Sequence, residues 1–360
     1  MIAEGVNALV VTSLPNILYL TNFTGSSAIA VLSADCLYFV TDFRYATSLI
    51  ASHATATGCP DLELVTVEGS YDVTLAALLA SHGWRRIGYE AAHLTVARYD
   101  WLKATLAADM PAPELVATDR AVERLRTIKD AYEIETLREA ARRLSQVAAG
   151  VMAAVRSGQT ERDLALAIDW RIRQGGFEKS AFDTIVASGP NAALPHARPE
   201  ERTITEGDLV VLDFGGVYDS YCVDLTRTVS VGPASPRARE VYAAVREARN
   251  RAIGTVAPGR SRFAIDAAAR DTLTRFGLGD AFGHGTGHGL GIEVHEDPRI
   301  ARRRPDVDTQ DEEVAPGMIF TIEPGAYLPG WGGVRIEDDV LVTDTGVEVL
   351  TDVTTELIEI

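Results

Sequence analysis

The residues best suited to chemistry lie between positions 282 and 298, in the segment FGHGTGHGLGIEVHEDP. Three of the chain's seven histidines, His284, His288 and His295, fall within twelve residues there, among five glycines. Histidine is the commonest neutral metal ligand and the usual proton carrier near neutral pH, and glycine permits close approach of other groups. The segment therefore predicts a metal or proton-transfer site; a glycine-rich loop with incidental histidines is the alternative.

Two aspartates interrupt strand-like sequence upstream. LVVLDF and CVDLTRTV are typical of a hairpin with its turn centred near Tyr218 and Asp219, which places Asp213 and Asp224 opposite each other. Opposed side chains have Cβ atoms roughly 5 Å apart, and like charges there are destabilising. Burying both carboxylates is costly unless a cation neutralises them. The pair therefore predicts a divalent metal site, with two turn or N-cap aspartates as the alternative.

Two glutamates at strand ends extend the acidic set. Glu323 follows MIFTI and precedes a Pro-Gly turn, and Glu337 follows a second apolar strand. Asp338 and Asp339 share that second stretch, so spacing alone makes Glu337 the best of three candidates. Four carboxylates match the charge of two divalent ions, and oxygen ligands with one imidazole suit Mn²⁺, Co²⁺, Fe²⁺ or Zn²⁺. Two such ions roughly 3.5–4 Å apart would activate a shared water for hydrolysis.

Composition argues against several other classes of protein. The length of 360 residues is typical of two domains, and no apolar run reaches the roughly 18 residues of a membrane span. The net charge of −17 disfavours nucleic-acid and anionic-membrane partners. MIAEGVNALVV lacks the basic start of a secretory signal, and Cys36, Cys59 and Cys222 form no CxxC pair. Together these features predict a cytoplasmic protein.

The elements that must position the candidate residues fall into two parts. In the first 120 residues, short β-rich runs alternate with amphipathic stretches, which predicts a small α/β domain. MPAPEL, at the end of this part, is typical of a turn or linker. The expected strands cover about 7–13, 28–33, 36–43 and 85–90, and the expected helices cover about 72–82 and 96–108.

The second part repeats one order of elements. A capping box at Thr127–Asp130 predicts a helix to about residue 156, although Asp replaces Glu at its last position. Thr160, Ser235 and Ser261 are predicted N-caps of three further helices. Helix, helix and strands thus follow one another from residue 127 and again from residue 236. This order predicts two similar halves with a site between them.

Five sequence motifs resemble those of the pita-bread metallopeptidases: methionine aminopeptidase, aminopeptidase P and prolidase. The resemblance is carried by NAALPHARP, LDFGGVYDSYCVDLTRT, GHGTGHGLGIEVHEDP, TIEPGAY and GVRIED. ILYLTNFTGSSAIAVL and FVTDFRY are similar to the amino-terminal domain of the prolidase, aminopeptidase P and creatinase branch. The resemblance implies an α/β (α+β) fold: a small amino-terminal α/β domain over residues 1–121, and a catalytic pita-bread domain over 122–360 with pseudo-twofold helix–helix–strand halves.

The same resemblance implies roles for single residues. The implied metal ligands are Asp213, Asp224, His288, Glu323 and Glu337, with Asp224 and Glu337 bridging two ions. The implied catalytic residues are His196, His295 and Glu323, and the implied substrate-binding residues are His284, Arg299, Tyr327 and Arg335. Three alternatives stay open: His284 as a loop support, Arg299 in an interloop salt bridge, and Arg335 as a partner of the carboxylates rather than a substrate clamp.

The resemblance implies an Xaa-Pro dipeptidase with two divalent ions per subunit, Mn²⁺ first, then Co²⁺, Zn²⁺ or Fe²⁺. The implied substrate is a small peptide with proline at its second position. No nucleic-acid or membrane partner is expected, and the branch implies a homodimer. The main alternative is an aminopeptidase P, which removes the first residue from longer Xaa-Pro peptides. A metal-free creatinase-like hydrolase and a non-catalytic binding module rank lower, because all five ligand positions are filled.

Overall fold

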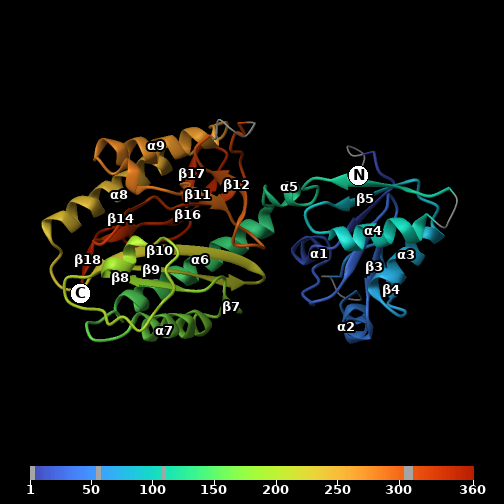
Figure 1. Ribbon diagram of the computed structural model, residues 1–360, viewed down its shortest axis with the longest axis horizontal. Coiled ribbons are helices and arrows are strands. Elements are labelled where there is room, and N and C mark those ends of the chain that lie inside the picture. The colour runs from blue at the N-terminus through green and yellow to red at the C-terminus, as the bar shows by residue number, and fades with distance from the viewer. Residues whose placement is uncertain (1–4, 54–57, 108–110, 304–310) are drawn as a thin grey trace. The chain divides into compact units, whose positions relative to one another are not determined.

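The computed structural model describes residues 5–53, 58–107, 111–303 and 311–360 (Figure 1). The chain divides into two compact units, Met1–Arg126 and Thr127–Ile360. The mixed α/β fold expected from the sequence is confirmed. Among the described helices, none is both long enough and apolar enough to cross a membrane.

The first unit is built on a six-stranded mixed sheet with the order β4–β3–β2–β1–β5–β6. Side chains of the central strand β1 alternate between its two faces. Ala8 and Val10 pack with α3 and α4, whereas Leu9 and Val11 pack with α1 and α2, so helices cover both faces. The strands are β1 Ala8–Val11, β2 Ile29–Leu32, β3 Leu37–Thr41, β4 Leu62–Thr66, β5 Arg86–Glu90 and β6 Glu114–Thr118. The helices are α1 Leu14–Thr21, α2 Phe43–His53, α3 Tyr71–Ser81, α4 Val96–Leu106 and α5 Glu123–Arg126.

The predicted strands and helices of this unit are present, but the prediction omitted α1, α2, α5, β4 and β6. Pro15 lies in the first turn of α1, where a missing N–H costs nothing. The prediction of a turn or linker in MPAPEL is wrong for its last two residues. Glu114 already belongs to strand β6, where it pairs with Arg86 of β5. Residue 108, the predicted end of α4, lies outside the described residues.

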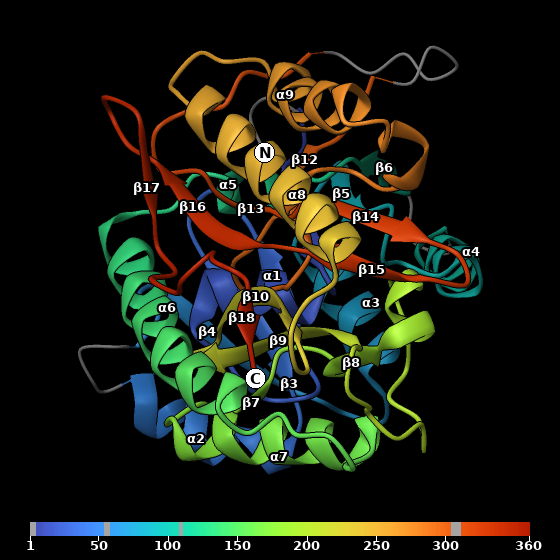
Figure 2. The ribbon, with the colours of Figure 1, turned by 90° about the vertical axis from the view of Figure 1, so that its left-hand side faces the viewer.

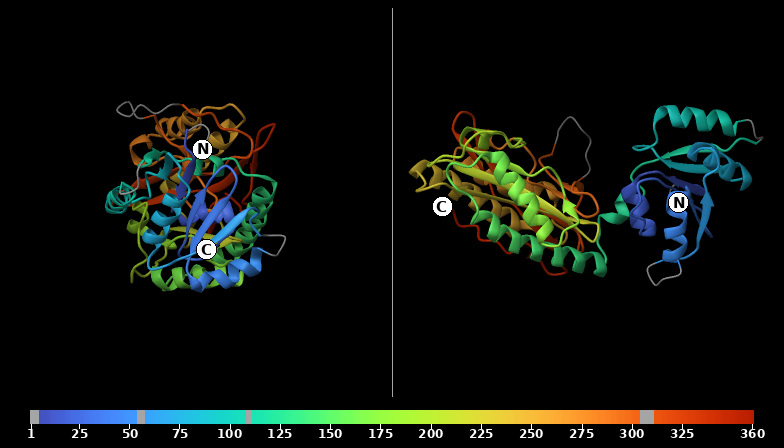
Figure 3. Two further views of the ribbon diagram at one scale, coloured as in Figure 1. Left: turned by 90° about the vertical axis from the view of Figure 1, so that its right-hand side faces the viewer. Right: turned by 90° about the horizontal axis from the view of Figure 1, so that it is seen from below.

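The second unit has the predicted repeat of helix, helix and strands. Helices α6 and α7 pack on the β9–β10 hairpin, and α8 and α9 pack on β13 and β16 (Figures 2 and 3). The helices are α6 Ala131–Met152, α7 Glu161–Gln174, α8 Pro236–Thr255 and α9 Arg262–Arg275, with short 3₁₀ turns η1 Gly189–Ala193 and η2 Gly279–Ala281.

The strands of the second unit form two five-stranded sheets and one two-stranded sheet. The first sheet holds β7 Lys179–Ser180, β8 Ile185–Ser188, β9 Leu209–Tyr218, β10 Tyr221–Ser230 and β18 Ile358–Glu359. The second sheet holds β11 Gly287–Gly289, β12 Glu296–Ile300, β13 Ile319–Ile322, β16 Asp338–Val342 and β17 Val347–Val349. Strands β14 Gly325–Leu328 and β15 Gly332–Arg335 pair with each other.

The helix starts follow local sequence, with one correction. Thr160, Ser235 and Ser261 are N-caps, as predicted, and each accepts a backbone N–H with its side chain. The predicted capping box at Thr127–Asp130 is wrong: Asp130 is the N-cap, and its box partner is Glu133. A capping box needs a carboxylate at the third helical position that reaches back to the N-cap N–H. Helix α6 therefore starts at Ala131, and it ends at Met152 rather than near 156.

The hairpin register also differs from the prediction. The turn residues are Asp219 and Ser220, with φ of 46° and 68°, so Tyr218 pairs with Tyr221. A two-residue hairpin turn with positive φ at both positions suits the twist of the strands, and aspartate tolerates that backbone better than a bulky tyrosine. Asp213 consequently lies opposite Thr226 and not opposite Asp224. The two aspartates are diagonal neighbours on one face, with Cβ atoms roughly 7–8 Å apart by sheet geometry.

Candidate metal centre

A cavity of about 720 Å³ in the second unit gathers the predicted site residues. Its lining comes from both halves of that unit, and of the predicted residues only Tyr327 is outside the described lining. The lining includes all five predicted metal ligands and, from the other predicted residues, His196, His284, His295, Arg299 and Arg335. Segments as far apart as 196 and 337 in sequence thus share one cavity.

Three of the predicted ligands form a tight group. Asp224, His288 and Glu337 are buried, and each offers one ligand atom within 4.8 Å of the others. Glu337 is the member of its acidic triplet that joins this group. Asp338 instead pairs with two arginines, and Asp339 Oδ2 accepts the backbone N–H of Asp224 at 3.0 Å. The structure therefore separates the three acids that the sequence left together.

The aspartates of the hairpin have open oxygen atoms. Asp213 Oδ2 accepts a hydrogen bond from Arg335 Nη2 at 2.5 Å. In contrast, Asp213 Oδ1 and Asp224 Oδ1 are buried and have no hydrogen-bond partner among the described residues. Buried polar atoms are nearly always satisfied by a partner. Two unpaired carboxylate oxygens beside a buried imidazole are therefore a donor set that suits a divalent cation.

His288 is held in the form that binds metal. Its Nδ1 lies 3.0 Å from the carbonyl oxygen of Gly289, so Nδ1 carries the proton and the Nε2 lone pair is available. Burial lowers the pKa of His288 to about 3. The 3.7 Å approach of Nε2 to Glu323 Oε1 is consequently not an ion pair near neutral pH. The neutral imidazole is the form that a metal requires.

Glycine places the His288 strand between two neighbours. A Cβ atom on Gly287 would lie 1.8 Å from the carbonyl oxygen of Thr321, and one on Gly289 would lie 2.0 Å from that of Asp297. Strand β11 therefore fits between β12 and β13 only without those side chains. The glycines predicted to allow close approach do so on both sides of the histidine.

The carboxylates of the site resist ionisation in the absence of a cation. Burial, followed by the charge of Glu337, raises the pKa of Asp224 well above its usual value. Burial, followed by the charge of Glu323, does the same for Glu337. Burial also raises the pKa of Glu323 to about 7, against a lowering by Arg335. A cation at the site would relieve the cost of carrying these charges together.

His284, Tyr327 and Arg335 form a hydrogen-bonded chain at the cavity wall. His284 Nδ1 lies 2.7 Å from the Gly285 carbonyl oxygen, so its Nε2 accepts the Tyr327 hydroxyl at 2.9 Å. That hydroxyl accepts Arg335 Nη1 at 2.8 Å. Burial lowers the pKa of His284 to about 4 and raises that of Tyr327 to about 12, so both are neutral at pH 7. Since Arg335 also pairs with Asp213, the chain leads to the carboxylates.

The remaining predicted residues, His196, His295 and Arg299, line the same cavity from different segments of the chain. The ring of His295 lies 4.3 Å from that of His288, and burial lowers its pKa. Arg299 pairs with His288 across the β11–β12 register. His196 follows Pro195, whose carbonyl oxygen accepts Arg335 Nη1 at 3.1 Å. Arg335 thus ties the His196 loop to the acidic site.

The sequence analysis did not single out Thr226, although it lies inside the site. Thr226 Oγ1 donates to Glu337 Oε2 at 2.5 Å and accepts Arg335 Nε at 3.2 Å. Thr226 is two residues beyond Asp224, so both side chains lie on one face of β10. That period of two in DLTRT is the signal by which the sequence could have revealed it.

Adding Mn²⁺ to metal-free protein is expected to raise its melting temperature, and more so at about pH 7.5 than at about pH 5. The raised pKa values of Asp224 and Glu337 favour the folded metal-free protein at low pH, and this contribution is lost as pH rises through them. Ions must displace those protons, and this competition weakens as the proton concentration falls. One site saturated 100-fold above its Kd contributes about 2.7 kcal/mol. A thermal shift that is equal at both pH values would contradict this expectation.

Comparison with known proteins extends these observations over both units. Residues 135–344 match the model of metallopeptidase family M24, and residues 1–128 match that of the creatinase/prolidase N-terminal domain. The chain is 41% identical over 246 residues to the Xaa-Pro dipeptidase of Pyrococcus furiosus, a match that covers 68% of this chain and 69% of that protein.

Solved structures are similar over almost the whole chain. The Xaa-Pro dipeptidase from Bacillus anthracis has a TM-score of 0.91 at 37% identity, covering 99% of this chain and 96% of that one. The X-Pro aminopeptidase from Thermotoga maritima has a TM-score of 0.87 at 32% identity, covering 99% and 98%. The two neighbours carry different names, so the fold alone does not separate the two activities.

Proposed function

The chain belongs to metallopeptidase family M24, and from that premise we propose that it is an Xaa-Pro dipeptidase dependent on two divalent ions. The observation that supports the metal centre best is the buried group of Asp224, His288 and Glu337. The Xaa-Pro dipeptidase relatives support the substrate class. We propose that the catalytic domain starts near residue 122 and that residues 1–121 form the amino-terminal domain.

We assign the two ions to Asp213, Asp224, His288, Glu323 and Glu337, with Asp224 and Glu337 shared between them. The open Oδ1 atoms of both aspartates and the available Nε2 of His288 support this assignment. When bound, the ions supply Lewis acidity and a water that ionises near neutral pH. We propose Mn²⁺ as the working metal before Co²⁺, Zn²⁺ or Fe²⁺, together with a homodimer in the cytoplasm.

Glu323 is the group that we assign to proton transfer. Glu323 lines the cavity, and its Oε1 lies 3.7 Å from His288 Nε2, so its carboxylate is within the proposed metal centre. It takes the proton of the attacking water and delivers it to the nitrogen of the departing proline. That nitrogen belongs to a tertiary amide without its own N–H, so the delivered proton is what allows it to leave as an amine.

His196 and His295 are assigned to catalysis, and His284, Arg299, Tyr327 and Arg335 are assigned to substrate binding. His196 and His295 line the cavity beside the carboxylates, which supports assigning them as donors to the oxygen of the scissile carbonyl. His284 and Tyr327 support the proline side, with Arg335 behind them. Arg299 is assigned to the carboxylate of the terminal proline, because a guanidinium fork binds a carboxylate through two parallel hydrogen bonds. An aminopeptidase P is the second candidate, supported by the Thermotoga maritima neighbour.

Substrate length and end charge test this proposal. Ala-Pro, Ala-Pro amide and Ala-Pro-Ala should be compared with Mn²⁺ or Co²⁺, and kcat/KM is expected to be highest for Ala-Pro. Arg299→Ala should lower kcat/KM for Ala-Pro by about 10–150-fold, the value of a charged hydrogen bond of about 1.5–3 kcal/mol. It should change Ala-Pro amide much less, because the amide lacks the carboxylate. Cleavage of Ala-Pro-Ala alone would favour the aminopeptidase and exclude the dipeptidase.

A further inference from the structure

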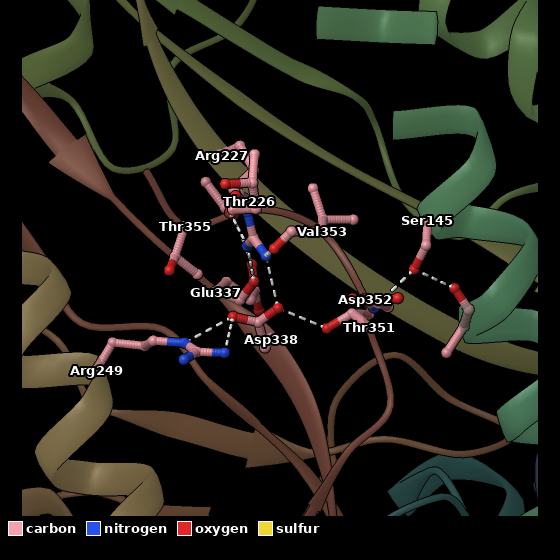
Figure 4. Close-up of polar contacts among 12 residues, drawn as sticks. Ser145, Thr226, Arg227, Arg249, Glu337, Asp338, Thr351, Asp352, Val353 and Thr355 are labelled. Carbon is pink, nitrogen blue, oxygen red and sulfur yellow. Dashed lines mark hydrogen bonds and ion pairs between the residues drawn. The ribbon is translucent and has the colours of Figure 1, made fainter. Parts of the chain in front are cut away.

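A buried charge cluster adjoins the proposed ligand Glu337 (Figure 4). Its centre is Asp338, which is fully buried between Arg227 and Arg249. Arg227 Nη2 lies 2.7 Å from Asp338 Oδ1, and Arg249 Nη2 lies 2.7 Å from Oδ2. Thr351 Oγ1 also donates to Oδ1, at 2.7 Å. The Asp338 carboxylate is therefore fully engaged away from the cavity and is not a spare ligand.

Arg227 uses every donor that a guanidinium has. The group carries five N–H bonds in a planar fork, and all five end on acceptors at hydrogen-bonding distance. These are Thr226 O at 2.9 Å and Glu337 O at 2.5 Å from Nη1, Asp338 Oδ1 at 2.7 Å and Val353 O at 2.8 Å from Nη2, and Thr354 O at 2.9 Å from Nε. The acceptors lie on three separate segments: strand β10, the 337–338 segment and the carboxy-terminal 353–354 segment.

Two of those acceptors belong to residues that also meet inside the metal centre. The Glu337 N–H donates to the Thr226 carbonyl oxygen at 3.1 Å, and Thr226 Oγ1 donates to Glu337 Oε2 at 2.5 Å. Arg227 therefore binds the carbonyl oxygens of both members of a pair whose side chains touch. Asp224 lies on the same face of β10 as Thr226, two residues away. The distance between the Glu337 and Asp224 carboxylates depends on this contact.

We propose that Arg227, together with Thr226, is a positioning residue that fixes Glu337 against strand β10 so that Glu337 and Asp224 can share the ions. The inference rests on the proposed function, because it takes those carboxylates as metal ligands. Lysine cannot replace the fork: an ammonium has three donors and a single centre, so it reaches only part of the acceptor set. Arg249 shares Asp338 but donates to Asp338 and Asn250 rather than to Thr226 or Glu337, so it provides a matched control.

The test is metal binding by the full chain. Metal-free wild type, Arg227→Lys and Arg249→Lys are titrated with Co²⁺ by calorimetry and by visible absorption, after circular dichroism has established that each is folded. We expect two Co²⁺ per wild-type chain. Arg227→Lys should weaken the second Co²⁺ by about 10–100-fold, as loss of a residue supporting a ligand does, and change the absorption spectrum. Arg249→Lys should bind both Co²⁺ ions with the affinity of the wild type, because Arg249 contacts neither Thr226 nor Glu337 in the described structure.

The outcomes separate the possible failures. Folded Arg227→Lys protein with wild-type affinity and spectrum would overturn the positioning role. If that variant does not fold, Thr226→Val carries the test, since it removes the hydroxyl that donates to the Glu337 carboxylate but leaves Arg227 in place. A wild-type Co²⁺ titration of Thr226→Val would then overturn the inference. Wild-type protein that fails to bind two Co²⁺ contradicts the proposed function itself, and the inference with it, whatever the variants do.

Discussion

Asp224→Asn is expected to lower kcat/KM for Ala-Pro by at least about 1,000-fold. Asp224 is buried, has an open Oδ1 atom and lies in the group with His288 and Glu337. An amide of the same shape carries no negative charge, so the proposed shared ligand is lost while packing is kept. Metal-ion catalysis is worth several kcal/mol, and each 1.36 kcal/mol is tenfold in rate.

The measurement is the rate of Ala-Pro hydrolysis at saturating Mn²⁺, with bound metal determined in parallel. Asp163→Asn is the matched control, because Asp163 is an exposed aspartate in the first turn of α7. The control should keep both metal content and rate. Near-normal turnover by Asp224→Asn would remove Asp224 from the assigned ligand set and with it the shared-ion arrangement.

Asp338→Ala is expected to lower the free energy of unfolding by about 3–5 kcal/mol, because it leaves the buried Arg227 and the mostly buried Arg249 without their anion. Arg227 and Asp338 side chains are only 2% and 0% exposed, and that of Arg249 is 13% exposed. Desolvation of the remaining arginine charges is then uncompensated. The loss should appear as a lower urea midpoint of the metal-free protein, followed by circular dichroism.

Two ion pairs of Glu139 at the surface provide the control for this effect on stability. Glu139 accepts Arg142 and Arg143 on the exposed side of α6. Glu139→Ala should leave the urea midpoint nearly unchanged, because exposed ion pairs contribute little. If Asp338→Ala unfolded at the same urea concentration as Glu139→Ala, the buried cluster would not hold the unit together.

Much of the second unit could be predicted because its signals are local. Thr160, Ser235 and Ser261 start helices where their side chains can accept backbone N–H groups, and such a choice depends on only a few neighbours. The same reasoning failed at Thr127, because a better box lies three residues later, at Asp130 and Glu133. Local rules therefore identified that helix but placed its start too early.

The sequence did not determine the register of the β9–β10 hairpin, and the predicted pairing was two residues away from the observed one. Its turn depends on which residues accept positive φ, and Tyr218–Asp219 and Asp219–Ser220 both contain an aspartate. The prediction that Asp213 and Asp224 share a strand face nevertheless holds, because a shift of two residues preserves the face of each side chain. Asp213 and Asp224 therefore lie on one face of the sheet, but the prediction that they pair directly across the hairpin was wrong.

The acidic triplet shows what only tertiary structure can decide. Glu337, Asp338 and Asp339 are consecutive, so spacing could rank them but not assign them. Asp338 finds Arg227, which lies 111 positions earlier, and Asp339 finds the N–H of Asp224. Which acid faces the cavity therefore depends on partners far away in sequence.

The division of the proposed ligands between two halves also bears on how the protein matures in the cell. Asp213 and Asp224 are translated in the first half, and every other ligand belongs to the second. A ribosome that has released only the first half has produced no imidazole of the set. A nascent chain that ends before Glu337 therefore lacks part of the proposed ligand set, and the complete set exists only once nearly the whole polypeptide has been made.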